Sequence, residues 1–153
     1  MIWSRIGAEE DAYYLLDAEG CEAVCGGSSA TARDVARLGE VIRRGGAIGD
    51  RQIVPEAVAP TIVPGVPDGY PRRVRLPAAP TDAPATLSYH DFWWIPNDPY
   101  GSFMASGIHG QRLFISPALG LVIVHYASQI ASPSVPQVPL VQAFLKIGTQ
   151  LCG

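Results

Sequence analysis

The chain has 153 residues, of which 48% are apolar, so it is long enough for one domain with a real core and too apolar for a disordered protein. Its formal net charge is −3, Lys146 is its only lysine, and its arginines are scattered apart from Arg72, Arg73 and Arg75. Nucleic acid is therefore excluded as a partner, because phosphate binding needs clustered cations. The arginine cluster lies among prolines and glycines, which is typical of a solvated loop.

The sequence predicts neither a membrane span nor a metal site. No segment approaches the ~20 consecutive apolar residues that a transmembrane helix needs. The first twelve residues carry acids where a signal peptide would have its apolar core, so we expect a cytoplasmic chain. Cys21, Cys25 and Cys152 are odd in number and match no metal-ligand spacing. We expect no cofactor or metal, with the cysteines as small core residues or exposed thiols rather than redox groups.

The N-terminal part predicts a hairpin followed by a helix. Residues 12–17, AYYLLD, are strand-like, 18–20 form a turn, and 21–25 return as the partner strand. Thr31 is typical of a helix N-cap, with Asp34 in the position of a capping-box acid. Apolar residues then recur at helical spacing on one face, at Val35, Leu38, Val41 and Ile42. The pair Gly45-Gly46 ends this helix.

Residues 47–87 contain few signals of regular structure. A short strand is expected at 52–54 and a brief helix after Pro55. From there to Pro84 recurring prolines exclude long helices and strands. A long irregular segment in a compact domain is either functional or wraps a larger body.

The last third of the chain predicts an antiparallel hairpin and a closing helix. SYHDFWWIP, residues 88–96, is expected to be a strand whose aromatics either pack in the core or line a cleft wall. The later elements are expected at 103–106 (strand), 112–115 (strand), 116–120 (turn), 121–126 (buried strand) and 140–151 (amphipathic helix).

Between two of these strands stands GIHGQ, residues 107–111, in which two glycines bracket a histidine. Glycine permits a close approach of backbone to a ligand and also permits a bulge. From these residues alone, Gly107 and Gly110 are interpreted as a bulge entering the hairpin, with His109 merely exposed. The alternative is a site where bare backbone faces a substrate.

A family resemblance favours the second interpretation. The segment from Trp3 to Gly46 reads WSRIGAEEDAY, then DAEG, then GGSSATARDVARLG, and it is followed in order by Trp93-Trp94, GIHGQ, a turn at Pro117 and LVIV. These pieces resemble the serine β-lactamase and penicillin-binding-protein superfamily, closest to its class C-type esterases and 6-aminohexanoate-dimer hydrolases. Only the C-terminal part of that enzyme is matched. The resemblance implies an α/β (α+β) fold, with antiparallel strands and flanking helices, over residues 1–153 as one partial domain.

That family hydrolyses esters, amides or β-lactams through an acyl-serine, and its central motifs are missing here. The nucleophile lies in Ser-x-x-Lys, but Ala143 stands three residues before the only lysine. The Tyr-x-Asn or Tyr-x-Ser motif matches only Tyr100 and Tyr126, both wrongly placed in the chain order. We therefore expect a segment without catalytic residues of its own, which is inactive alone. It would be a truncated remnant of such an enzyme, one piece of a split protein, or the result of a reading frame started at the wrong place.

The resemblance implies that GIHGQ is half of an oxyanion hole. The strand at this place in the family donates one backbone N–H to the developing oxyanion, and Ile108 is the matching position. Gly107 and Gly110 would permit close approach, and His109 would line the cleft. The expected substrate is a small ester or amide, bound once a second segment completes the site.

Two alternatives remain open. A non-catalytic binding or assembly module would use the open sheet edge for self-association or a partner chain. A free-standing esterase would use Ser106 with His109 as its base. Among the other polar residues, His90 and His125 are expected to be structural. The acids Glu9, Glu10 and Asp11 are expected to form a solvated turn rather than an acid pair.

Overall fold

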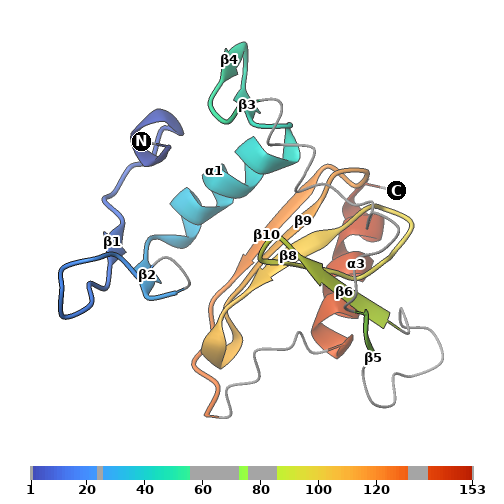
Figure 1. Cartoon of the computed structure of the whole chain (residues 1–153). Helices are drawn as coiled ribbons and strands as arrows, with labels where there is room; N and C mark the ends of the chain where they lie inside the picture. The colour runs from blue at the N-terminus through green and yellow to red at the C-terminus, as the bar shows by residue number, and fades with distance from the viewer. Residues whose placement is uncertain (1, 24–25, 56–72, 76–85, 131–137, 153) are drawn as a thin grey trace.

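The computed structural model describes residues 2–23, 26–55, 73–75, 86–130 and 138–152 (Figure 1). In chain order its elements are η1 (Trp3–Arg5), β1 (Tyr13–Tyr14), β2 (Ser28–Ser29), α1 (Ala32–Arg43), β3 (Ala47–Ile48), β4 (Arg51–Gln52), β5 (Arg73–Arg75), β6 (Thr86–His90), β7 (Trp93–Ile95), β8 (Phe103–Ser106), η2 (Ile108–Gly110), β9 (Arg112–Ser116), β10 (Leu121–His125) and α3 (Val138–Cys152).

The central element is a six-stranded sheet in the order β10-β9-β8-β7-β6-β5, and every neighbouring pair in it is antiparallel. Each strand lies next to the strand that precedes it in sequence, so the sheet is a simple meander. Both β8 and β9 lie inside the sheet, paired from Phe103↔Ile115 to Ser106↔Arg112. The predicted α+β class, with an antiparallel sheet and flanking helices, is confirmed.

The two faces of the sheet bury different residues because side chains alternate along a strand. One face carries Phe103, Leu113 and Ile115, on which Val35 and Ile42 of α1 pack. The other face carries Met104 and Phe114, covered by Val141 and Phe144 of α3. Figure 1 shows the two helices on opposite sides of the sheet. The sheet is therefore the middle layer of three.

A smaller cluster lies on the outer side of α1. Ile6, Val41 and Ile53 are buried together there, with Trp3 and Leu38 packed against them. The N-terminal turn and the β3–β4 hairpin therefore cover the side of α1 that faces away from the sheet.

The predicted start and end of α1 are confirmed. Thr31 is the N-cap, its side chain accepts a hydrogen bond from the Asp34 N–H, and the helix runs to Arg43. Gly45 and Gly46 follow with φ of +66° and +92°, values that favour glycine. The closing helix, predicted at 140–151, begins two residues earlier, at Val138.

The strand predictions need corrections. The segment 88–96 is a hairpin of β6 and β7 rather than one strand, because Asp91 and Phe92 adopt φ of +48° and +68° and turn the chain. The predicted hairpin near residue 16 forms through the bridge Leu16↔Glu22, but the regular partner of β1 is β2, at Ser28–Ser29.

Two further strands differ from the prediction. The strand expected at 52–54 is the shorter β4 at Arg51–Gln52, which pairs with β3. All residues of β10, predicted to be buried, are only half-buried. The short helix expected after Pro55 lies outside the described residues. None of the described helices is long and apolar enough to cross a membrane.

Candidate functional site

The segment GIHGQ closes the β8–β9 hairpin, and we call residues 107–111 the site loop. Its two ends meet where the Gly107 N–H donates to the Gln111 carbonyl at 2.9 Å. Between them η2 makes one tight turn. The glycines therefore lie in the hairpin loop itself. The interpretation from these residues alone, a bulge entering the hairpin, is wrong, because the ladder stays in register up to Ser106↔Arg112.

Two residues of the site loop have left-handed backbone conformations. His109 has φ of +60° and Gly110 has φ of +96°. A left-handed conformation costs an L-residue about 1–2 kcal/mol, so His109 must be held by other contacts. A Cβ at Gly110 would lie 3.0 Å from the Ala127 Cβ and from the Gln129 Cδ. Glycine is therefore required at 110 by conformation and by space.

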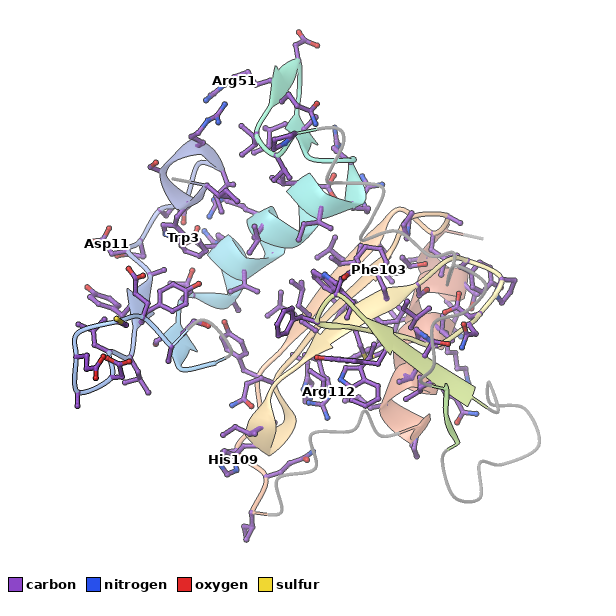
Figure 2. The ribbon with its side chains drawn as sticks, viewed as in Figure 1. Trp3, Asp11, Arg51, Phe103, His109 and Arg112 are labelled. Carbon is purple, nitrogen blue, oxygen red and sulfur yellow. The ribbon has the colours of Figure 1, made fainter. Side chains whose placement is uncertain are left out.

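Residues 126–130, which follow β10, hold the loop in place, and we call them the strap. His109 makes two contacts with it: its carbonyl accepts from the Gln129 N–H at 3.0 Å, and its Nδ1 lies 2.9 Å from the Gln129 carbonyl oxygen. The Gln111 side chain donates to the Ala127 carbonyl at 3.2 Å. His109 is thus exposed but tied to the strap (Figure 2).

Two further side chains fix the loop from the sheet. The Nδ1 of His125 lies 2.9 Å from the Gly110 carbonyl oxygen, which confirms the expectation of a structural histidine. Arg112 Nη1 donates to the carbonyls of Gly107 and Gln111, at 2.9 and 2.6 Å. The Arg112 side chain is buried, and its desolvation lowers the pKa of the guanidinium.

These contacts leave the backbone N–H of Ile108 free within the described part of the chain. No acceptor for this N–H appears there; the bonds above use the Gly107 N–H and the carbonyl oxygens of Gly107, His109, Gly110 and Gln111. The Ile108 side chain is 60% exposed, so the residue lies at the surface. The loop therefore presents the Ile108 N–H at the end of the sheet, and a fixed main-chain donor of this kind can stabilise a developing negative charge.

The aromatic residues mainly pack within the fold. Trp93 meets Phe103 edge-on at 5.1 Å on the α1 face, and Trp94 lies 4.8 Å from the Tyr89 ring and packs into the α3 face. Phe92, at the β6–β7 turn, is 76% exposed. Core packing thus accounts for both tryptophans. The His90 side chain lies outside the described residues.

The N-terminal acids Glu9, Glu10 and Asp11 are exposed, as expected of a solvated turn, and the backbone of the first two bonds the helix-cap residue Asp34. The Asp34 carboxylate accepts from the backbone N–H groups of Glu9 and Glu10 and from the Thr31 hydroxyl, and it pairs with Arg37. These bonds, led by the one from the Glu9 N–H, lower the pKa of Asp34 to about 2.

Sequence reasoning missed the two residues that do most to define the loop. Arg112 was assigned only to a strand, and Gln129 was assigned to no element. Their roles depend on contacts across the hairpin and with the strap, which no local pattern marks. In the described part of the chain, no group of three or more His, Cys, Asp or Glu side chains lies together as metal ligands would.

Comparisons with known proteins agree on one family. No protein-family model matches the chain. The 6-aminohexanoate-dimer hydrolase of Paenarthrobacter ureafaciens is 31% identical over 127 residues, which are 83% of this chain and 31% of that protein. A Bacillus anthracis protein whose solved structure carries the same enzyme name is 31% identical, with a TM-score of 0.73 over 98% of this chain and 36% of that one. The chain spans about a third of the length of both.

Proposed function

We propose that the chain is the C-terminal, oxyanion-binding segment of a serine hydrolase of the β-lactamase/transpeptidase-like superfamily, one that cleaves small esters or amides. The observation that carries this proposal is the site loop with its fixed donor, the Ile108 N–H. The similarity in sequence extends over 83% of the chain and the similarity in fold over 98%.

In acyl transfer to a serine, the role we propose for the site loop is to stabilise the oxyanion. When a serine oxygen attacks the substrate carbonyl, the carbonyl oxygen becomes an oxyanion and accepts hydrogen bonds from preorganised N–H groups. The Ile108 N–H is one such group. Its loop is held by Arg112, His125 and the strap, so little reorganisation is needed during the reaction. Losing one such donor costs about 3–4 kcal/mol of barrier in comparable sites.

In the proposed reaction a second segment supplies the nucleophile. The sequence holds no Ser-x-x-Lys, since Ala143 precedes the only lysine at that spacing. Gly110 faces the strap rather than a substrate, so in this proposal the substrate approaches at Ile108 and the exposed Gly107, with His109 beside the donor. The segment completes an acyl-transfer site but does not start the reaction.

A second candidate function is a binding or assembly module that associates through the sheet edge. In the described part of the chain, β10 has a strand partner on one side only, and its sequence LVIVH carries none of the lysines or acids that protect exposed edges. This function predicts a stable homo-oligomer or complex, which size-exclusion chromatography with light scattering detects.

The proposal is tested by hydrolysis of p-nitrophenyl butyrate by the purified chain, with Ser106→Ala as the matched variant. We expect wild type and variant to release p-nitrophenol at the same rate, without saturation by substrate. Saturable turnover that Ser106→Ala abolishes while the circular dichroism spectrum stays unchanged would show a nucleophile within the chain. The partial-site proposal would then be wrong, and the Ser106–His109 esterase would replace it.

A further inference from the structure

The chain from β1 to β2, residues 13–29, forms what we call the N-terminal hairpin. Figure 1 shows it at the left edge of the molecule, beyond the start of α1. Its main chain is hydrogen-bonded, because the Leu15 N–H donates to the Gly27 carbonyl at 3.0 Å and the Asp17 N–H to the Cys21 carbonyl at 2.9 Å. None of its described residues belongs to the three hydrophobic clusters of the fold. A two-stranded hairpin without such packing is only marginally stable in water, so a surface that covered it would stabilise it.

Four consecutive large side chains of this hairpin are exposed. Tyr13, Tyr14, Leu15 and Leu16 are 68, 52, 66 and 60% exposed. Successive side chains of an extended segment point to opposite sides, so both sides of the hairpin are apolar here. A hairpin that only covers a core is apolar on the core side and polar on the other. Exposed apolar side chains gathered in one place therefore indicate an interaction surface.

The charge of the same region has one sign. Residues 6–32 contain six acids and no lysine, arginine or histidine. Among the described residues, Glu9 is the only one of these acids that takes part in an ion pair. Glu22 is exposed and lies directly opposite Leu16, on the same side of the hairpin. An unpaired acid thus borders the exposed apolar side chains.

This charge distinguishes between possible occupants of the surface. A second copy bound through the same hairpin would bring two acidic surfaces together, and like charges oppose association. Nucleic acids and anionic lipid surfaces are repelled for the same reason. A polypeptide segment with apolar side chains on one face and lysines or arginines beside them would bury the tyrosines and leucines and also pair with the acids.

We propose that the N-terminal hairpin binds a cationic amphipathic segment of another polypeptide. Tyr14 and Leu16 pack on the apolar face of that segment, and Glu22 faces its cations. The binding uses no residue of the site loop or the strap and requires no acyl transfer. It therefore goes beyond the proposed function and does not depend on the oxyanion role of Ile108.

The test measures binding of a synthetic peptide in which leucines and lysines repeat at helical spacing. The peptide carries a fluorescein label, and the full chain is added at physiological salt while fluorescence anisotropy is recorded. A peptide with glutamate in place of every lysine is the control. We expect saturable binding of the lysine peptide, weaker binding when sodium chloride is added, and no binding of the glutamate peptide.

A first pair of variants tests the apolar contact. Tyr14→Ser combined with Leu16→Ser removes one apolar side of the hairpin and spares Leu15, whose side chain lies over Gly27. We expect this double variant to raise the Kd of the lysine peptide by about tenfold or more. Ile147→Ser combined with Leu151→Ser removes two exposed apolar side chains of α3 and should leave the Kd unchanged. Circular dichroism checks that both double variants are folded.

A second pair tests the charge. Glu22→Gln and Asp50→Asn each remove one exposed acid, in the hairpin and between β3 and β4, and neither acid forms an ion pair within the described part of the chain. We expect Glu22→Gln to weaken binding by up to about fivefold and Asp50→Asn to leave it unchanged. No binding of the lysine peptide, or equal affinities within either pair of variants, would overturn the proposal. A dimer in light scattering that only the Tyr14–Leu16 variant dissociates would also overturn it, because the hairpin would then bind a second copy.

Discussion

Substituting Gly110 by alanine tests how tightly the site loop packs on the strap. The matched control is Gly120→Ala, in the β9–β10 turn. Both glycines have positive φ, +96° and +60°, so both substitutions force alanine into a left-handed conformation. At Gly120 the nearest group to a new Cβ is Arg43 Nη1 at 4.0 Å, which is ordinary contact. At Gly110 the new Cβ would meet two strap side chains at 3.0 Å.

The expected losses differ for this reason. Gly120→Ala carries the conformational cost alone, about 1–2 kcal/mol of the free energy of unfolding. Gly110→Ala adds overpacking of about 1–3 kcal/mol, so its total is about 2–5 kcal/mol. The entropy that alanine removes from the unfolded chain is the same in both variants and cancels in their difference.

Urea unfolding followed by tryptophan fluorescence measures both losses. We expect the Gly110→Ala midpoint to fall clearly below that of Gly120→Ala, with unchanged slopes. Equal midpoints would refute the close packing of loop and strap. The loop could then not be the rigid donor-bearing element described above.

Two further variants test the core and the helix cap. Phe114→Ala empties a fully buried position between the sheet and α3, and we expect it to lower the free energy of unfolding in urea by about 3–5 kcal/mol. The control Ile147→Ala, at a 42%-exposed position of α3, should lower it far less. Equal losses in the two variants would contradict the three-layer packing. Asp34 has a folded pKa of about 2, below its ordinary 3.8, so its ionised form stabilises the fold above the ordinary value. That stability is lost as the pH falls from about 4 toward 2. We therefore expect the melting temperature of the wild type to fall over this pH range, and to fall less in Asp34→Asn. The same fall in both proteins would exclude Asp34 as its source.

Local patterns predicted the elements that local chemistry determines. The capping residues Thr31 and Asp34 and the glycines after the helix set α1, and its bounds follow from them. The strands around GIHGQ also follow from their apolar runs and the turn at Pro117. In contrast, the β6–β7 turn at Asp91 and Phe92 contains no glycine or proline, so the sequence predicted a single strand across this aromatic segment.

The site loop was located by its glycines, but its rigidity was not predictable. It depends on Arg112, which reaches back across the hairpin, and on Gln129, which comes from a segment beyond β10. Such contacts are set by tertiary packing, and nothing in the spacing of GIHGQ marks them. The partner of β1 was misplaced for a related reason, because the loop between the two strands is longer than the turn signal at 18–20 indicated.

The most direct test of the oxyanion role removes the Ile108 N–H. In a hybrid enzyme, residues of this chain would replace the matching 127-residue segment of the Paenarthrobacter ureafaciens hydrolase. Ile108→Pro deletes the donor at the first position of η2, where proline fits, and Gly107 before it is already extended. Ile108→Val keeps the donor and serves as the control. Release of 6-aminohexanoate from the dimer gives kcat for each. We predict an active hybrid whose kcat falls about 10²–10³-fold with proline and little with valine. A proline variant as active as the valine variant would contradict the assignment of Ile108 as an oxyanion donor.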